Sequence, residues 1–329
     1  MQDIPGAFSL SAHTLTAANK PKPFSLAGWW SRNQRKLIPY IFLAPFLLSF
    51  LVFTVYPAGA AFFLSFQRVR GFISPDEGGG VVLEYKGLDN YERLLTKDKR
   101  FRTAIINGAE FAIGTVLIQM PIALGMALLM NAPHIRFKVL ARLAFFAPYI
   151  TSAIVVGWIF TLIFQDRYGL LNAAFNALGL ESVGWLTDRN FVMPALIILG
   201  LWTWCGYNSL FFLAGLQNVP DDLKEAARID GANTIRVFWH ITIPFLRPVF
   251  VFVVITGLIG SFSLFSQPYL LFDSGAGPGD AGLFPVMYLF FMGFENFRMG
   301  YASAIGYLLT AIILLITGLQ LLLFRLWRV

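Results

Sequence analysis

The sequence predicts an all-α polytopic membrane protein with six transmembrane helices. Hydrophobic residues make up 57% of its 329 residues and charged residues only 13%, whereas soluble domains carry about 25% charged residues. The mean hydropathy is +0.66. Six windows that are nearly free of charge are each long enough for a helix to cross about 30 Å of hydrocarbon. Backbone groups in lipid must be satisfied within the protein, so these windows are expected to be helices.

The predicted spans follow an N-terminal tail, residues 1–36, which is polar and basic. We expect this tail to be cytoplasmic and mostly disordered, and it does not resemble a cleaved signal peptide. Residues 37–329 form the predicted transmembrane domain. Its six spans are residues 37–67, 104–131, 143–164, 191–213, 248–272 and 301–324.

The net charge of +7 is better explained by cytoplasmic loops rich in Lys and Arg than by binding to nucleic acid. The external loop 68–102 is an exception, because it holds many basic and acidic residues. Elsewhere the basic residues concentrate in the tail, around Arg136 to Arg142 and in the loop 214–247. This bias predicts that both termini are cytoplasmic.

Two external loops are expected to contain secondary structure. In the loop 68–102, a glycine run at 78–80 is followed by a β-like run at 81–85, and residues 87–95 favour a surface helix before the second span. After the third span, residues 169–179 place apolar side chains at helical spacing. We expect a short interfacial helix there.

Neither a catalytic nor a metal site is indicated by the residue types that usually form one. Cys205 is the only cysteine, and the three histidines lie far apart. We expect Cys205 to be a packed small residue. No Walker A sequence is present, so the chain is expected not to bind ATP. Glu110, inside the second span, is either a substrate or ion site or a carboxylate that reaches water at the external end of the helix.

The loop 214–247, between the fourth and fifth spans, carries the main motif. Pro220 followed by two aspartates is a favourable helix start, because acidic residues stabilise the positive end of the helix dipole, and Gly231 is a favourable helix stop. One face of this predicted helix is small at its middle, so another surface can approach it closely. That face consists of Leu223, Ala226, Ala227 and Asp230.

A second amphipathic helix is expected over residues 233–243, where it would present Val237, Phe238 and Ile241. The two helices would form a helix–turn–helix platform that projects from the membrane on the inside. Such a platform is suited to docking another protein. An ordinary cytoplasmic hairpin is the alternative.

This loop resembles the EAA loop of ABC importer permeases, in which Glu-Ala-Ala is followed at set intervals by Gly, Ile and Pro. The matching residues are Glu225, Ala226, Ala227, Gly231, Ile241 and Pro244. Three further stretches are similar to the carbohydrate branch of that family, and they are Gly87 to Tyr91, Gly275 to Pro278 and Gly300 to Ala304. Together the matches cover residues 37–329. The resemblance, to maltose-type and glycerol-phosphate-type subunits, implies the type I permease fold with a cytoplasmic coupling helix, in a bacterial inner membrane.

The resemblance also implies partners. These are a second homologous permease, a dimer of ABC ATPases that binds ATP and Mg, an extracytoplasmic solute-binding protein and the lipid bilayer. The chain itself would bind no cofactor and hydrolyse no ATP. The coupling helix would insert into a cleft of the ATPase, with Glu225 in polar contact, Gly231 setting the turn and Asp230 helping to fix it.

The implied substrate is a carbohydrate: a sugar, an oligosaccharide, a polyol or glycerol phosphate. Sugar rings offer C–H faces and hydroxyl groups, so their sites combine aromatic and hydrogen-bonding side chains. The fourth and fifth spans offer both at Trp202, Gly206, Tyr207, Asn208, Ser209, Ser261, Phe262, Ser263, Leu264, Phe265 and Gln267. The alternative is that these polar residues only bridge helices.

By resemblance, Gly206, Ser209, Ser261 and Leu264 lie at or near sugar-contact positions of the maltose-type subunit. That subunit has Asn where this chain has Ser261 and Leu264, which argues against the same sugar.

Two other classes of membrane protein are alternatives. A secondary transporter or channel that works without ATP would be expected to show charged relays inside its spans and repeated halves, but only Glu110 lies inside a predicted span. A membrane-embedded enzyme would need a nucleophile, a metal or an acid pair at membrane depth, and the sequence offers none.

Overall fold

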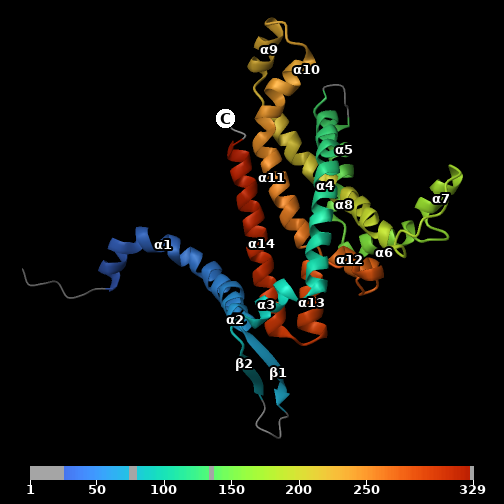
Figure 1. Ribbon diagram of the computed structural model, residues 1–329. Coiled ribbons are helices and arrows are strands. Elements are labelled where there is room, and N and C mark those ends of the chain that lie inside the picture. The colour runs from blue at the N-terminus through green and yellow to red at the C-terminus, as the bar shows by residue number, and fades with distance from the viewer. Residues whose placement is uncertain (1–25, 74–79, 133–136, 327–329) are drawn as a thin grey trace, which may run out of the picture. The chain divides into compact units, whose positions relative to one another are not determined.

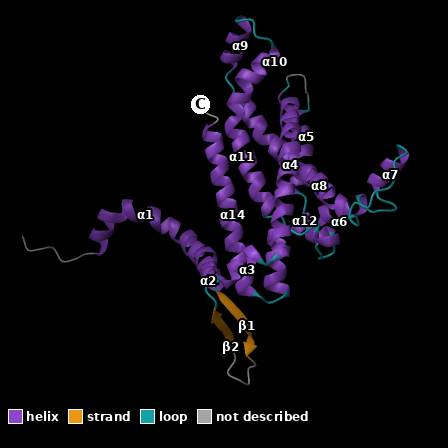
Figure 2. Ribbon diagram, in the orientation of Figure 1, coloured by secondary structure: helices purple, strands orange, loops and turns teal. Residues whose placement is uncertain are grey.

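The computed structural model describes residues 26–73, 80–132 and 137–326. The chain divides into two compact units, residues 1–58 and 59–329. Helices dominate the described residues, and the strands drawn in Figure 2 belong to one hairpin.

The first unit is helical from Leu26 onward. Helix α1 (Leu26–Phe50) leads through a π-helical turn (Leu51–Val55) into α2 (Tyr56–Ser65). Residues Gln34–Ser65 are long and apolar enough to cross a membrane, which agrees with the first predicted span. The expected disorder of the tail is wrong for residues 26–36, because the helix of the span extends back through them. Residues 1–25 lie outside the described residues.

The second unit contains the other candidate spans. Within the described residues, five helices are long and apolar enough to cross a membrane, or six if one bent pair counts as a single span. This agrees with the six predicted windows. In the second unit the straight spans are α4 (Lys99–Asn131), α8 (Arg189–Gln217), the continuous helix Thr234–Phe262 and α14 (Met299–Leu326).

The ends of two spans differ from the prediction. Helix α4 begins at Lys99 because the carboxylate of Asp98 accepts a hydrogen bond from the Phe101 amide at 3.0 Å and caps the helix. The fifth span ends at Phe262, and the apolar residues that follow form the separate short helix α12 (Ser266–Leu271). Hydropathy did not reveal this break because both of its sides are apolar.

The third predicted span is broken. Helices α5 (Lys138–Ile150) and α6 (Ala153–Ile163) meet at a bend of 92°, so the expectation of one continuous helix over 143–164 is wrong. Pro148 lies in the last turn of α5, where its ring crowds the preceding turn. The Thr151 hydroxyl donates to the Ala147 carbonyl at 2.8 Å, and such bonds bend helices.

Helix α4 packs against both α8 and α11 (Ile243–Phe262), the main part of the fifth span, and Figure 1 shows it beside α11 and crossing α8. Glycines allow the close approach. A Cβ at Gly200 of α8 would lie 2.9 Å from the Phe111 ring of α4, and one at Gly108 of α4 would lie 3.1 Å from the Phe262 ring of α11. The Phe111 ring also meets the edge of Phe284 at 5.5 Å, at the centre of the buried core.

An antiparallel hairpin of β1 (Gln67–Ile73) and β2 (Gly80–Tyr85) lies at one end of the second unit (Figure 1), with Gln67 opposite Tyr85. The β-like run at 81–85 is confirmed, although its pairing with 67–73 was not foreseen. The surface helix expected over 87–95 is also confirmed, as α3 (Asp89–Thr96). Residues 74–79, which include most of the glycine run, lie outside the described residues.

A cluster of polar side chains forms hydrogen bonds between several elements at the hairpin end of the second unit. The Asp98 carboxylate accepts hydrogen bonds from the hydroxyls of Tyr288 (2.7 Å) and Tyr301 (2.5 Å). Arg100 binds both oxygens of Asp280, at 2.9 and 2.7 Å. Tyr288 belongs to α13 (Pro285–Phe290) and Tyr301 to α14. The start of α4 is therefore bonded to α13, to α14 and to the loop after α12.

We expect Asp98→Asn to destabilise the protein by about 2 kcal/mol, because it removes the charge from these hydrogen bonds. Burial alone would raise the pKa of Asp98, but the bonds from Tyr301, from the Phe101 amide and from Tyr288 lower it below its ordinary 3.8. The carboxylate thus stabilises the fold at all pH values above 3.8, and this contribution disappears only as the pH falls through the lowered pKa.

Thermal unfolding in detergent, measured from pH 8 down to about pH 3, checks this expectation. Asp89→Asn, which removes an exposed carboxylate of α3, is the matched control and should have little effect. Equal unfolding temperatures for the two variants at neutral pH would contradict the role of Asp98.

Candidate functional site

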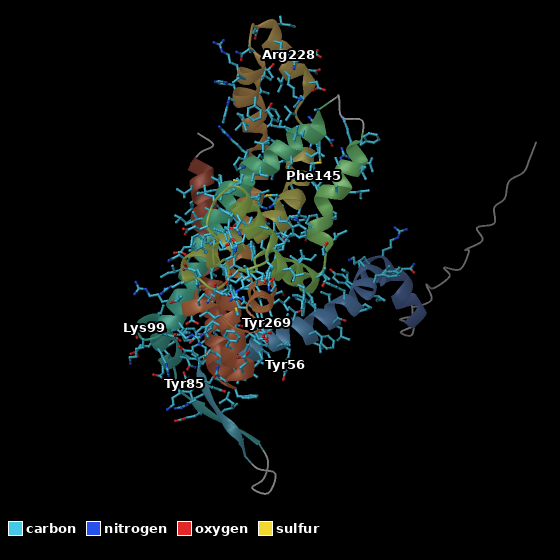
Figure 3. All side chains as sticks on the ribbon, turned by 90° about the vertical axis from the view of Figure 1, so that its right-hand side faces the viewer. Tyr56, Tyr85, Lys99, Phe145, Arg228 and Tyr269 are labelled. Atoms are coloured by element: carbon cyan, nitrogen blue, oxygen red, sulfur yellow. The ribbon has the colours of Figure 1, made fainter. Side chains whose placement is uncertain are left out.

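Helix α9 (Asp221–Ile229) projects at the end of the second unit opposite the hairpin (Figure 1). Figure 3 shows Arg228 of α9 at this end and Lys99, at the start of α4, toward the other. Asp221 and Asp222 lie in the first turn and Arg228 in the last, which suits the helix dipole. The Lys224 ammonium, 2.9 Å from Asp221, lowers the pKa of that carboxyl. The helix start and stop predicted from Pro220 and Gly231 are both confirmed.

The turn after α9 requires glycine. Gly231 has a φ of +82°, and its amide donates to the Arg228 carbonyl at 3.0 Å while the Ala232 amide donates to the Ala227 carbonyl at 2.9 Å. This is the Schellman pattern of a helix end. No atom lies within 4 Å of a Cβ built at Gly231, so backbone conformation and not space demands the glycine. Backbone bonds close the turn, and a contribution from Asp230, whose side chain is exposed, stays a prediction.

Helix α9 has no buried residue along its nine positions. Glu225 and Ala226 are exposed, and Leu223 is 45% exposed. Short helices in water gain most of their stability from packing, yet α9 packs few of its side chains against the rest of this unit. A helix presented in this way is suited to insertion into a groove of another protein.

The platform differs from the prediction beyond Gly231. The residues expected to form an independent helix over 233–243 are instead the first turns of the continuous helix Thr234–Phe262, which includes α10 (Thr234–Val237) and a π-helical turn (Phe238–Thr242). The π-helical turn widens the helix just before Pro244, where a proline ring would otherwise crowd the preceding turn.

The apolar residues on the surface of the platform also differ from those expected. Val237 is buried (6% exposed), and Phe238 and Ile241 are half-buried. Besides Leu223, the large apolar residues exposed there are Ile229 (86%), Ile235 (68%) and Trp239 (61%). Sequence reasoning missed these three, although Ile235 and Trp239 show the i, i+4 spacing of one helix face.

An aromatic cluster lies at the bend between α5 and α6. The ring of Tyr207, on α8, stacks on that of Tyr149 with centroids 4.1 Å apart, and Trp204 meets Tyr149 edge-on at 5.3 Å. All three are half-buried. The sequence named Tyr207 as a pathway residue but missed Tyr149, which lies in the last turn of α5. The available signal was Pro148 and the Thr151-Ser152 pair within the third predicted span.

Two of the three serines among the predicted pathway residues, Ser209 and Ser261, donate their hydroxyl protons within their own helices. Ser209 donates to the Gly206 carbonyl at 2.6 Å, and Ser261 donates to the Gly257 carbonyl at 2.8 Å. Both side chains are buried. These hydrogen bonds favour a structural role for the two serines within their helices. They argue against a role as hydrogen-bond donors to a sugar, because each hydroxyl proton is already used.

The remaining predicted pathway residues are spread over several surroundings. Asn208, Phe262 and Leu264 are buried, whereas Ser263 is exposed and Gln267 half-buried. Trp202 meets Phe160 of α6 edge-on at 5.3 Å, and Phe265 stacks on Tyr269 of α12 at 5.0 Å. In Figure 3, Tyr269 lies toward the hairpin end and Phe145 of α5 nearer α9. A common site for the predicted residues of α8 and of the α11–α12 region stays a prediction.

Gly206 has a structural explanation. A Cβ at this position would lie 1.6 Å from the carbonyl oxygen of Phe145, so the backbones of α8 and α5 touch there. Close approach of two membrane helices is a common reason for a glycine.

The two other residues singled out in the sequence have simple surroundings. Cys205 is buried, as expected of a packed small residue. Glu110 lies on α4 with its side chain exposed.

Long apolar helices, one of them broken at a bend, define the class of this protein as a multi-pass membrane protein. A family model described as "Binding-protein-dependent transport system inner membrane component" matches residues 119–329. The chain belongs to this family. It is a permease subunit, a transport component and not an enzyme.

Curated relatives match over most of their length. The chain is 40% identical to the "Arabinooligosaccharides transport system permease protein AraP" of Bacillus subtilis, over 92% of this chain and 93% of that protein. It is 32% identical to the "Lactose transport system permease protein LacF" of Rhizobium radiobacter, over 85% and 92%.

A solved structure shows the same fold. A chain of a bacterial ABC transporter involved in the import of the acidic polysaccharide alginate superposes with a TM-score of 0.75, at 21% identity, over 91% of this chain and 98% of that one. The type I permease fold expected from the sequence is therefore confirmed.

Proposed function

We propose that this chain is one permease subunit of an ATP-driven importer that translocates a carbohydrate delivered by an extracytoplasmic binding protein. The observation that carries the proposal is 40% identity, over nearly the whole chain, to a permease named for arabinooligosaccharides. Relatives named for lactose and diacetylchitobiose support the same class of solute. A solved complex of the alginate transporter with its "periplasmic protein" shares this fold and supports delivery by a binding protein.

ATP acts through partner chains in this proposal. A dimer of ABC ATPases holds ATP and Mg, and this chain binds no cofactor of its own. Helix α9 inserts into a cleft of one ATPase, with Glu225 in polar contact and the small side chains of Ala226 and Ala227 allowing close approach. Ile229, which is 86% exposed, adds apolar area. Closure of the ATPases then moves α9 and the spans it joins as a rigid body.

The orientation of the chain in the membrane follows from the docking of α9 on the ATPase. Helix α9 faces the cytoplasm of a bacterial cell, and the C-terminal end of α14 lies toward α9 (Figure 1), so the C-terminus is cytoplasmic as well. The Lys and Arg bias of the loops supports both termini on this side. A second, homologous permease completes the pathway.

The substrate passes the bend between α5 and α6. Non-helical backbone at membrane depth is tolerated only where it is buried in protein or lines a water-filled cavity, and broken helices in transporters form substrate sites. At this bend, Tyr149, Trp204 and Tyr207 supply aromatic faces for the C–H faces of a sugar ring. The freed backbone groups around Ser152 supply hydrogen-bonding partners for its hydroxyls.

Tyr149→Ala is expected to reduce uptake about tenfold, since an aromatic face contributes about 0.5–1.5 kcal/mol beyond its buried area. Tyr149→Phe keeps the ring and should retain most of the uptake. Initial rates of labelled-sugar uptake, normalised to the amount of complex in the membrane, check this expectation. Equal uptake by the alanine and phenylalanine variants would exclude Tyr149 from the pathway.

Reconstitution tests the proposed function as a whole. Proteoliposomes that hold the complete complex and its binding protein should accumulate an arabino-oligosaccharide or a disaccharide only when ATP is supplied, and should not accumulate an amino acid. Accumulation without ATP would instead favour a secondary transporter or channel. ATP-driven uptake of the amino acid alone would refute the carbohydrate class.

A further inference from the structure

The segment between α6 and α8 folds into a small lobe of its own, residues 164–188, which includes α7 (Leu170–Ala177). Its centre is the side chain of Asn172, which is fully buried. The Asn172 amide nitrogen donates to the carbonyls of Asp166 (2.9 Å) and Val183 (2.8 Å). Its oxygen accepts from the Val183 amide (3.1 Å) and from the Trp185 indole (2.9 Å). One amide thus holds both sides of the lobe together.

Aromatic side chains complete the interior of the lobe. Trp185 is 6% exposed and packs against Phe175 at 5.5 Å, Phe191 at 5.9 Å and Phe164 at 6.0 Å. Phe164 is fully buried. The polar side chain at the centre of the lobe is therefore fully hydrogen-bonded, and the aromatic side chains around it are packed. Asn172 and Phe175, both on α7, take part in these contacts and fix the orientation of the helix.

The outward face of α7 is apolar along its whole length. We call this face the outer stripe: Leu170, Ala173, Ala174, Ala177 and Leu178, all exposed. Leu170 is 71% and Leu178 78% exposed, and Tyr168 (83%) and Leu180 (51%) extend the apolar surface beyond the helix. The spacing i, i+3, i+4, i+7, i+8 is that of one side of a helix. The stripe contains no charged residue.

This pattern differs from that of a helix bordered by water. Such a helix presents mainly polar residues outward, whereas α7 presents leucine and alanine outward and directs Leu171, Asn172 and Phe175 inward. Helix α6 packs against α7 and is itself apolar on its exposed side, where Ile154 (58%), Trp158 (70%) and Leu162 (64%) recur every four residues. The helix that contacts α7 therefore also presents apolar side chains outward.

We propose that the outer stripe lies in the lipid bilayer, at the boundary between headgroups and acyl chains, and anchors the lobe that follows the broken span. Helices α6 and α8, which flank the lobe, belong to membrane spans, so the lobe lies close to the lipid bilayer. A soluble binding protein would leave during each transport cycle and would expose the stripe to water, whereas the bilayer is always present. Tyr168, amphipathic and exposed, and the charged residue Arg167 beside the stripe suit the headgroup level.

Quenching of a fluorescent label tests this proposal in the complete complex, held in lipid nanodiscs. Cys205, the only cysteine, is first replaced by serine. Single cysteines are then introduced by Ala174→Cys, in the outer stripe, and by Glu181→Cys, an exposed charged position of the same lobe, as the matched control. Each is labelled with a polarity-sensitive dye. The quenchers are lipids with a nitroxide near the headgroup and, separately, iodide in the water.

We expect nitroxide lipids to quench most of the emission at position 174, which should be blue-shifted, and iodide to have little effect there. Position 181 should show the opposite. Strong quenching by iodide at both positions would overturn the proposal, because the stripe would then face water. Protection of position 174 from both quenchers would also overturn it, because the second permease or the binding protein would then cover the stripe. If the Ala174→Cys variant fails to assemble, Ala177→Cys, one turn further along the stripe, replaces it.

Discussion

Replacing Gly231 with valine is expected to lower ATP-driven uptake by about tenfold or more, without loss of membrane insertion. At a φ of +82°, a residue with a Cβ costs about 1–2 kcal/mol, and a β-branched residue is a still greater outlier. The Schellman turn after α9 would open to relieve this strain, and α9 would no longer hold its direction. In the proposed mechanism, this direction transmits ATPase closure to the spans.

Asparagine is the matched control at this position. It tolerates the left-handed conformation better than any other residue except glycine, so Gly231→Asn should retain most of the uptake. A Cβ at this position meets no atom within 4 Å, so crowding cannot account for a difference between the two variants. Uptake is measured in cells, and the amount of permease in the membrane is measured by immunoblotting. If valine transports as well as asparagine, α9 does not act as a lever.

Gly206→Ala is expected to have the second large effect, on assembly. The added Cβ would lie 1.6 Å from the carbonyl oxygen of Phe145. Because that atom belongs to the backbone, no change of side-chain rotamer can relieve the clash, and α8 and α5 must move apart. Overpacking of this kind costs about 3 kcal/mol, and the displacement also separates Tyr149 from Tyr207. We expect both a lower unfolding temperature and loss of uptake.

Gly125→Ala is the control for Gly206→Ala. Gly125 also lies inside a membrane helix, α4, but nothing lies within 4 Å of a Cβ built there. Alanine favours helix by about 1 kcal/mol over glycine, so this variant should be unchanged or slightly more stable. Thermal unfolding of the purified complex separates the two. An unfolding temperature for Gly206→Ala equal to that of Gly125→Ala would show that the contact between α8 and α5 is not tight.

Much of the fold could be predicted because a bilayer imposes a long apolar stretch on every span. Hydropathy records length and polarity but not direction, so it could not distinguish a straight helix over 143–164 from two helices at 92°. The same limitation merged α12 with the fifth span. Only local chemistry, at Pro148, Thr151 and Ser263, marks these breaks, and each of these residues is also common within straight helices.

The two parts of the candidate site were predictable to different degrees. The α9 turn is local: a helix start, a helix stop and a glycine lie within one short stretch, and the structure reproduces them. The aromatic cluster is not local, because Tyr149 and Tyr207 come from different helices and meet only after α5 and α8 have packed at Gly206. Sequence spacing carries no information about such a contact, and Tyr149 was missed for this reason.

The side of the membrane on which ATP is required is the direct test of coupling through α9. Proteoliposomes are prepared with the complete complex in a known orientation, established by protease access to α9, and ATP is supplied on one side of the membrane only. Sugar accumulation is expected only when ATP is on the side where α9 lies, with the binding protein and the sugar on the opposite side. Accumulation with ATP confined to the opposite side, or with no nucleotide on either side, would contradict coupling through α9.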